Sequence, residues 1–383
     1  MSMTRADAEH LARQGVEALR RGDGASARAS FEAIVAARPA DFPLPWLALA
    51  QACRLSADTA AETDALQAQL REQPRHIAAL LLMGDRKRLD GDDRAASNFY
   101  TAALNQAAVS RDVPPSLHPL LRQAEAFKQD TNQRFTAHLE AAIPAAPPAR
   151  VAQSLDLLLG RRDLYQQQPS MFYFEGLPQR AFYDRTDFDW VAELEAATPA
   201  IRAELEAITE GFAPYVEGNP DRPLPNNPLL NDPAWGALHL WRGGEMVAAN
   251  AARFPATMAA LAKVPIPQIA GRSPMALFSR LTPGTHIQPH HGLLNTRLIC
   301  HLPIIAPSGC GLRVGADVHE WRAGELVIFD DSFEHEAWNR GSETRTVLLF
   351  EIWKPEIDAD ERAALTQLFE AIDAYGPPML DQG

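Results

Sequence analysis

The amino-acid sequence predicts a multidomain α + β protein, with α-helical repeats in its N-terminal part and an antiparallel β-barrel or sandwich with flanking helices in its C-terminal part. Residues 5–108 are rich in Ala, Leu, Arg and Glu and place apolar side chains at helical spacing. Residues 275–353 instead contain six short runs typical of β-strands, separated by turn sequences such as Thr-Pro-Gly and Arg-Ala-Gly. A chain of 383 residues is long enough for two or three domains.

A spacing of about 34 residues recurs in the N-terminal part. Pro39 and Pro74 are 35 residues apart, and Phe31 and Phe99 are 68 apart, which is two periods. This pattern resembles tetratricopeptide repeats, with about three units of which the middle one is degenerate. Stacked helix pairs bury a continuous core, so we expect a helical repeat domain over residues 1–110. Its concave face either binds a peptide or protein partner or serves only as a scaffold.

The remaining chain divides into a linker and a second domain. Residues 111–170 look helical but contain proline-rich breaks, so we expect a helical linker there. The second domain is expected over residues 171–383. Amphipathic helices are predicted at 189–209, at about 250–263, and at 358–375.

Composition excludes several classes of partner and location. The net charge of −13 and the pI near 5.3 argue against binding to nucleic acid or to an anionic membrane, because phosphates would be repelled. Three cysteines without a Cys-x-x-Cys pair indicate reduced thiols. The chain starts with charged residues and contains no run of 18 apolar residues. We therefore expect a soluble, cytoplasmic protein without a membrane anchor.

Histidines gather where the strands are expected. Six of the eleven histidines lie between residues 286 and 335, and a cluster of imidazoles in a small β-barrel is a candidate metal site. His290 lies at the far end of a strand that follows a Pro-Gly turn, and His335 begins a strand after a loop. About three strands separate them, which can bring both rings to one mouth of a barrel. Fe(II) oxygenases hold their metal with two histidines and one carboxylate, and leave positions open for a cosubstrate and O2.

Other side chains near these histidines suit the binding of a dicarboxylate. Arg345 begins the last core strand, and a planar guanidinium binds a carboxylate through two hydrogen bonds. Strand alternation places Arg297, Ile299 and His301 on one face of their strand, opposite an apolar face. Ser279 shares a face of its strand with Leu281 by the same rule. A polar face of this kind predicts the lining of a cavity.

The stretches FSRLTPGTHIQPHHGLLNTRLICHLPI, GELVIFDDSFEHEAWN and RTVLLFEIWKP resemble the aspartyl/asparaginyl β-hydroxylase family of 2-oxoglutarate oxygenases. The resemblance covers roughly residues 165–360. It implies a double-stranded β-helix, the jelly-roll or cupin-like fold, and a Fe(II)- and 2-oxoglutarate-dependent dioxygenase. Such an enzyme would hydroxylate a C–H bond of an Asp or Asn residue in a peptide or protein. Members of this family often carry tetratricopeptide-like helices ahead of the catalytic domain.

The same resemblance implies a role for each matching residue. His290 and His335 would bind iron, and Arg345 would complete the catalytic set. The residues implied to bind the 2-oxoglutarate cosubstrate, or to lie near it or the substrate, are Trp235, Ser279, Arg297, His301 and Arg345.

Two departures from the usual patterns bear on the substrate. Most 2-oxoglutarate oxygenases carry the third, carboxylate ligand two positions after the first histidine, where this chain has Gly292; the resembling family lacks it too. Ile299 stands where the family usually has a second arginine. Asp330 and Asp331 either supply a carboxylate or, as we favour, cap a turn or orient a histidine. The alternatives are the same chemistry on a small molecule or lipid, and a non-catalytic scaffold.

Overall fold

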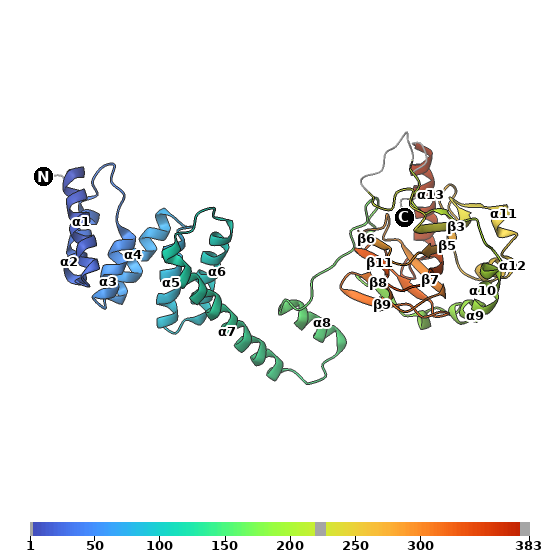
Figure 1. Ribbon diagram of the computed structural model, residues 1–383, viewed down its shortest axis with the longest axis horizontal. Coiled ribbons are helices and arrows are strands. Elements are labelled where there is room, and N and C mark those ends of the chain that lie inside the picture. Colours follow the sequence, from blue (N-terminus) through green and yellow to red (C-terminus); the bar gives the residue numbers. More distant parts are fainter. Residues whose placement is uncertain (1–2, 219–226, 376–383) are drawn as a thin grey trace. The chain divides into compact units, whose positions relative to one another are not determined.

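The computed structural model describes residues 3–218 and 227–375, and the chain divides into two compact units, Met1–Ala152 and Gln153–Gly383 (Figure 1). The first unit is helical and the second is built around β-sheets, as the sequence predicts for a multidomain α + β protein. Across the described residues, none of the helices combines the length and apolar character that crossing a bilayer requires.

The helical unit contains three helix pairs followed by a longer helix. Their bounds are α1 (Arg5–Arg20), α2 (Gly24–Ala37), α3 (Trp46–Leu55), α4 (Thr59–Glu72), α5 (Ile77–Leu89), α6 (Asp93–Val109) and α7 (His118–Ala142). Each helix packs against the next, and their small and apolar side chains form two adjoining clusters. The second cluster includes Leu120, Leu121 and Phe127 of α7, so α7 is part of this unit. The expected linker over 111–170 therefore divides between the two units.

One turn recurs between the two helices of every pair. A residue with positive φ precedes an aspartate whose side chain accepts a hydrogen bond from the backbone three residues on, which caps the second helix. The positive-φ residues are Gly22 (φ 73°), Ala57 (φ 56°) and Gly91 (φ 77°), and the capping aspartates are Asp23, Asp58 and Asp92. The aspartates are 35 and 34 residues apart, so this turn accounts for the period seen in the sequence.

We expect the substitution Ala57→Gly to stabilise the helical unit by about 0.5–1 kcal/mol. Ala57 is exposed and its backbone is in the left-handed conformation, which costs a residue with a Cβ atom roughly 1–2 kcal/mol. Glycine avoids this cost, but part of the gain is offset because glycine has more conformational freedom in the unfolded chain. Urea denaturation followed by far-UV circular dichroism measures the effect. The matched change Ala33→Gly, on the exposed face of α2, should destabilise by a similar amount. If the urea midpoint of Ala57→Gly equals that of the natural protein, the left-handed backbone of Ala57 does not reduce stability.

Close packing of a glycine under an aromatic ring also repeats. A Cβ atom on Gly15 would lie 2.6 Å from the ring of Phe31, and one on Gly84 would lie 2.6 Å from the ring of Tyr100. Tyr100 is buried and its hydroxyl donates to Asp85 at 2.6 Å. Tyr100, rather than Phe99, therefore corresponds to Phe31, and the two-period spacing at this position is 69 residues.

The second unit contains two antiparallel sheets. The large sheet has the order β1-β10-β7-β12-β5-β3-β2, with β4 paired to β3, and the small sheet has the order β6-β11-β8-β9. The large sheet's bounds are β1 (Phe182–Tyr183), β10 (Val327–Phe329), β7 (Arg297–Ile305), β12 (Arg345–Trp353), β5 (Ala276–Leu281), β3 (Trp235–Arg242), β2 (Ala213–Pro214) and β4 (Glu245–Met246). Those of the small sheet are β6 (His286–His290), β11 (His335–Asn339), β8 (Cys310–Val314) and β9 (Asp317–Glu320).

The two sheets enclose one apolar core between them. It joins Leu277 and Val347 of the large sheet to Ile287 and Leu312 of the small sheet. This is the arrangement of a double-stranded β-helix, so the predicted fold class is confirmed. Alternation along β7 also follows the prediction: Ile299 lies in this inner core, whereas the alternating residues Leu298, Cys300 and Leu302 lie in a cluster on the other face of the sheet.

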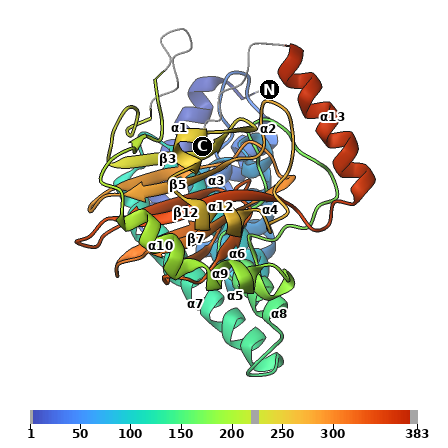
Figure 2. The same cartoon turned by 90° about the vertical axis from the view of Figure 1, so that its right-hand side faces the viewer.

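Short helices pack on that other face, where Figure 2 shows strands β3, β5, β12 and β7 side by side. Their bounds are α9 (Val191–Ala196), α10 (Thr198–Glu206), α11 (Ala248–Ala251) and α12 (Pro255–Leu261). The single helices expected at 189–209 and 250–263 are thus each two helices, because Pro199 and Pro255 lie in the first turn of a new helix. Helix α8 (Ala149–Leu158) precedes the sheets, and α13 (Ala359–Tyr375) follows them as predicted.

Candidate active site

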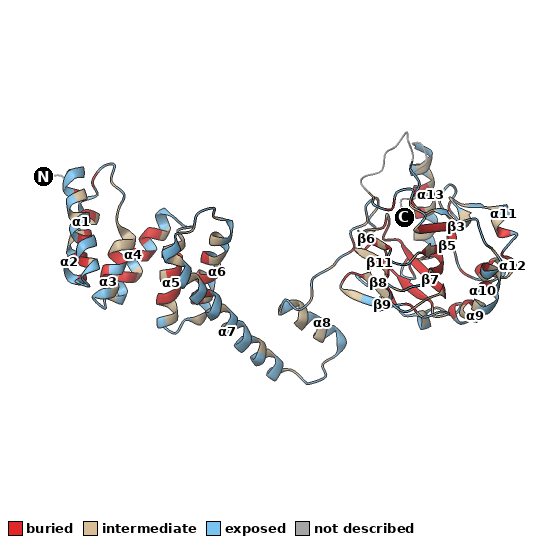
Figure 3. Ribbon diagram, viewed as in Figure 1, coloured by how far each residue is buried: buried red, intermediate tan, exposed pale blue. Residues whose placement is uncertain are grey.

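A cavity of about 70 Å³ lies between the two sheets. Figure 3 shows in red that much of strand β7 of the large sheet is buried. All seven residues to which the sequence resemblance assigned a role line this cavity. They are Trp235, Ser279, His290, Arg297, His301, His335 and Arg345. Strands β3, β5, β6, β7, β11 and β12 supply them, so residues separated by more than 100 positions meet in one place.

His290 and His335 face each other across the pairing of β6 and β11. They are direct partners in the register, and their ring centroids are 4.1 Å apart. Nδ1 of His290 lies 2.8 Å from the carbonyl oxygen of Gln288, and Nδ1 of His335 lies 3.0 Å from that of Phe333. A carbonyl oxygen only accepts, so each Nδ1 carries the proton and donates it. Each Nε2 therefore keeps its lone pair for a metal ion.

Burial keeps both imidazoles neutral. It lowers the pKa of His335 to about 3, and the neighbouring His290 contributes to this shift. It also lowers the pKa of His290 below its ordinary value. Near neutral pH neither ring carries a second proton that would compete with a metal.

Arg345 is a buried cation for which the described part of the chain shows no matching anion. Its side chain is 1% exposed, and its guanidinium carbon lies 4.3 Å from the ring centre of Trp321. Among the described residues, neither Nε nor Nη1 finds a hydrogen-bond partner. Burial lowers the pKa of Arg345 to about 10, so the group remains charged near neutral pH. An unpaired buried charge is costly, and these two N–H groups fit the carboxylate of a ligand.

Trp235 and Ser279 are joined on the same side of the cavity as Arg345. The indole Nε1 donates to the hydroxyl of Ser279 at 3.2 Å, and Trp235 and Arg345 both pair with Leu281 on β5. The ring of Tyr215 stacks on Trp235, with centroids 4.0 Å apart and planes 5° apart, and also lines the cavity. Sequence reasoning missed Tyr215, because an isolated tyrosine in a loop carries no pattern. The sequence analysis also did not predict strand β3, which carries Trp235.

Arg297 lies within reach of two acidic side chains. Its Nη1 donates to Glu351 at 2.7 Å, and its Nη2 donates to Asp331 at 3.4 Å. Asp331 also explains Gly292: a Cβ atom at position 292 would lie 2.1 Å from Oδ2 of Asp331. The Asp331 carboxylate thus occupies the space that a side chain at position 292 would need. His301 is enclosed by aromatic rings, and burial holds its pKa well below the ordinary value.

We expect Gly292→Ala to destabilise the protein by about 1–3 kcal/mol, because the added methyl group must displace the Asp331 carboxylate. Urea denaturation of the two single variants and the double variant with Asp331→Ala tests this. The double variant should lose less stability than the sum of the losses in the two single variants. We expect the difference to be at least about 1 kcal/mol. Additive effects would mean that the two positions do not compete for space.

Asp330 has a structural place beside the site. Its carboxylate accepts from Lys354 at 2.5 Å and from Gln167 at 2.9 Å, and it caps the turn at Ser332. Asn295 in turn donates to the side chain of Gln167 at 2.9 Å. Asp330 and Lys354 are both fully buried. This network fixes the loop that leads from β10 to His335.

The described residues hold no group of three or more His, Cys, Asp or Glu side chains placed to bind a metal together. Asp331, one of the two carboxylates considered from the sequence, is engaged by Arg297 instead. The histidine pair is therefore the metal-binding element that the described chain offers, and the remaining ligands of an ion would be water or a bound acid.

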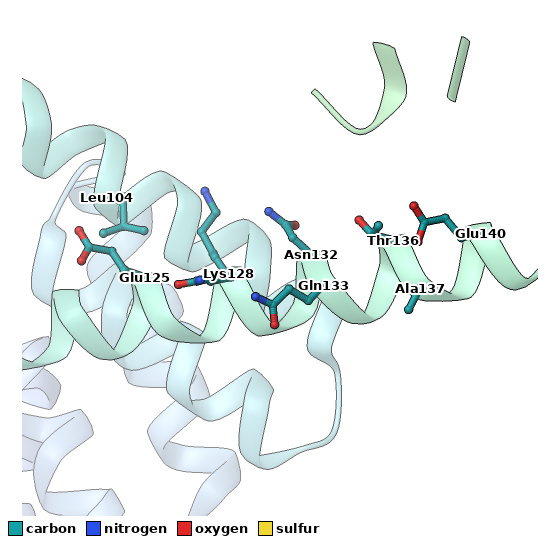
Figure 4. Close-up of a pocket in the computed structure, with 9 residues that line it drawn as sticks. Leu104, Glu125, Lys128, Asn132, Gln133, Thr136, Ala137 and Glu140 are labelled. Atoms are coloured by element: carbon teal, nitrogen blue, oxygen red, sulfur yellow. The ribbon is translucent and has the colours of Figure 1, made fainter. Parts of the chain in front are cut away.

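A wider hollow of about 550 Å³ lies on the helical unit, along α7 and beside Leu104 of α6 (Figure 4). Charged and amide side chains such as Lys128 and Asn132 line it, and it contains no histidine or cysteine. Its composition does not point to catalysis, so the cavity between the sheets is the candidate active site.

Comparison with known proteins agrees with this site. Residues 195–355, which carry all seven of the side chains named above, match the family described as Aspartyl/Asparaginyl beta-hydroxylase. This stretch is similar to an aspartyl/asparaginyl β-hydroxylase domain. The resemblance read from the sequence motifs is confirmed. This β-hydroxylase domain includes both sheets' central strands and ends just after β12.

Two relatives of the β-hydroxylase domain differ in what their names say they act on. The ornithine lipid ester-linked acyl 2-hydroxylase of Rhizobium tropici is 36% identical over 178 residues, which cover 45% of this chain and 60% of that protein. The aspartyl/asparaginyl beta-hydroxylase of Homo sapiens is 34% identical over 145 residues, which cover 37% of this chain and 19% of that protein. The chain thus spans less than two thirds of either relative.

Among solved structures, an oxidoreductase of the 2OG-Fe(II) oxygenase family from Burkholderia pseudomallei is similar at a TM-score of 0.30 and 13% identity. The match covers 48% of this chain and 95% of that chain. A likeness at this score carries no argument, so the fold assignment depends on the strand pairing described above.

Proposed function

We propose that this protein is a Fe(II)- and 2-oxoglutarate-dependent dioxygenase that hydroxylates a C–H bond of a peptide, protein or lipid substrate. The observation that carries the proposal is the pairing of two kinds of site in one cavity. Two neutral imidazoles with available Nε2 atoms line it together with a buried guanidinium, two of whose nitrogens find no hydrogen-bond partner within the described ranges. A metal ion and the far carboxylate of a diacid match these two features.

The residues present fit the cosubstrate and the metal in their chemistry. His290 and His335 would hold the iron, and Arg345 would pair with the far carboxylate of 2-oxoglutarate. Ser279 and Trp235 would line the cosubstrate beside Arg345, and His301 and Arg297 would complete the polar lining. When bound, iron and 2-oxoglutarate supply the oxidising chemistry: one atom of O2 enters the substrate as a hydroxyl group and the other enters succinate, with release of CO2.

The apolar lining of the cavity would keep water away from the reacting atoms. Met275, Ile287 and Leu349 contribute to it, together with Phe329. Exclusion of water strengthens the ionic contacts of Arg345 and limits side reactions. The protein itself would thus bind and orient the metal, the cosubstrate and the substrate, and would shield the reacting atoms from water.

The test is the conversion of 2-oxoglutarate to succinate by the full chain in the presence of Fe(II) and O2. We expect succinate to form, formation to stop when a chelator removes the metal, and the two ligands together to raise the melting temperature. The absence of both succinate and a shift in melting temperature would favour the alternative of a non-catalytic scaffold, which Gly292 and Ile299 first suggested.

A further inference from the structure

The two proposed metal ligands lie where their strands end. β6 ends at His290 and β11 begins at His335, and the pairing of these strands is irregular between His335 and Ala337. The loops beyond the two histidines, 291–296 and 330–334, are not part of this pairing. The end of a paired strand is where a sheet opens most readily. Contacts that hold the two loops together would therefore fix the distance between the two imidazole rings.

A short segment ahead of the sheets forms hydrogen bonds with both loops. We call residues 167–174 the bridging segment. The backbone N–H of Gln168 donates to the carbonyl oxygen of Ser332 at 2.7 Å. The backbone N–H of Ser170, two residues further on, donates to the carbonyl oxygen of Gly292 at 2.9 Å. The bridging segment thus ties the loop that follows the first histidine to the loop that precedes the second.

Gln167 anchors the bridging segment from inside the domain. Its side chain is 5% exposed, and its amide nitrogen donates to the carboxylate of Asp330 at 2.9 Å. Its amide oxygen accepts from the side chain of Asn295, also at 2.9 Å. Asp330 lies five residues before His335, and Asn295 lies five residues after His290. One buried amide therefore joins the two loops at matching distances from the two proposed ligands.

The two partners of this amide are themselves held in place. Asp330 is fully buried, accepts from Lys354 at 2.5 Å, and accepts from the backbone N–H of Ser332 at 3.0 Å. The side chain of Asn295 accepts from the backbone N–H of Phe174 at 2.6 Å and donates to the carbonyl oxygen of the same residue at 2.9 Å. A buried network whose members are hydrogen-bonded to one another favours a single arrangement.

We propose that Gln167 is a positioning residue for the metal site, because it fixes the separation of His290 and His335 through the loops that carry them. Gln167 is not among the residues that line the cavity, so it acts through these loops and not on the metal itself. The inference rests on the proposed function. It adds the bridging segment, which lies ahead of the stretch 195–355 that matches the hydroxylase family, to the parts of the chain that determine metal affinity.

The substitution Gln167→Met tests the proposal, because it keeps the length of the side chain and removes its hydrogen bonds. The Kd for Fe(II) is measured by calorimetry on the full chain, without O2 and well below the melting temperature. We expect the Kd to rise about tenfold or more, since groups that orient metal ligands typically change metal affinity by about 10- to 100-fold. A residue that only stabilised the fold would lower the melting temperature and leave this Kd unchanged.

Thr257→Val is the matched control. Thr257 is fully buried, and its hydroxyl donates to Glu204 at 2.7 Å. It lies in α12, among the helices on the other face of the large sheet. The variant also loses a buried hydrogen bond of the same domain, and its melting temperature should fall as well. Its Kd for Fe(II) should change by less than about threefold, because no loop of the metal site is affected.

Hydrogen exchange of the natural protein gives a second test that needs no variant. If the bridging segment strengthens metal binding, bound metal must in turn stabilise the bridging segment, because such coupling is reciprocal. The backbone amides of Gln168 and Ser170 should therefore exchange at least about threefold more slowly with Fe(II), without O2, than in its absence. The amides of α12 should keep their rates. Gln167→Met should abolish the slowing.

An unchanged Kd in Gln167→Met, or an equal rise in Thr257→Val, would overturn the inference. Exchange at Gln168 and Ser170 that Fe(II) does not slow would overturn it too, and this result decides alone if Gln167→Met does not fold. The natural protein separates the two proposals. If it binds Fe(II) and forms succinate while one of these results is found, only the positioning role fails. If it neither binds Fe(II) nor forms succinate, the proposed function fails.

Discussion

Replacing His335 with alanine is expected to lower bound iron and succinate formation by more than about 100-fold. The structure offers two imidazoles for the metal and no third acidic or histidine ligand among the described residues, so each ring supplies half of the protein's ligand set. Losing a residue that merely orients a ligand costs 10- to 100-fold in metal affinity, and losing a ligand should cost more. His290→Ala should behave in the same way.

Metal analysis after gel filtration, together with the rate of succinate formation, measures this effect. His291→Ala is the matched control, because His291 directly follows a proposed ligand and is half-buried but is not part of the cavity lining. It should retain both metal and activity. Iron retained at the natural level in His335→Ala would contradict the proposed site, and iron lost only in His291→Ala would mean that His291 is the ligand.

Replacing Arg345 with methionine is expected to raise the KM for 2-oxoglutarate by a factor of about 30 to 5,000. Removing one partner of a buried, hydrogen-bonded charge pair costs about 2–5 kcal/mol, and each 1.36 kcal/mol is a factor of ten. Without ligand the same substitution should leave stability unchanged or increase it, because it removes a buried charge that no acidic side chain among residues 3–218 and 227–375 is seen to match.

Initial rates at varied 2-oxoglutarate concentration, and urea denaturation without ligand, measure the two effects of Arg345→Met. Arg322→Met, an exposed arginine of the same domain, should change neither quantity. A large loss of stability in the ligand-free Arg345→Met protein, with an unchanged KM, would show that Arg345 is structural and that 2-oxoglutarate binds elsewhere.

The sequence predicted those parts of the site that depend on strand alternation and on local motifs. Arg297, Ile299 and His301 line the cavity because alternate residues of a strand share a face. The histidine pair follows from two motifs that each end or begin a strand beside the same mouth. The helix pairs follow from the spacing of Asp23, Asp58 and Asp92, although the sequence alone did not show that these aspartates set the period.

Contacts between distant segments could not be predicted in the same way. Nothing in the sequence relates Tyr215 to Trp235, or Gly292 to the carboxylate of Asp331, because these contacts depend on how loops pack and not on a repeating pattern. The spacing of aromatic residues was misjudged by one position, since Phe99 and Tyr100 are adjacent and only packing against Gly84 distinguishes them.

The hydrogen bonds of Gln167 have a practical consequence for producing the β-domain alone. A fragment that starts at residue 171, where composition changes, would lose the amide that bridges Asp330 and Asn295, and also the two-point contact of Arg162 with Asp317 at 2.9 and 2.6 Å. Asp330 and Asn295, both buried beside the loop that presents His335, would each lose one of their hydrogen-bond partners. A truncation intended for crystallisation should therefore retain the chain from before Arg162, because we expect the shorter fragment to be less stable around the loop that presents His335.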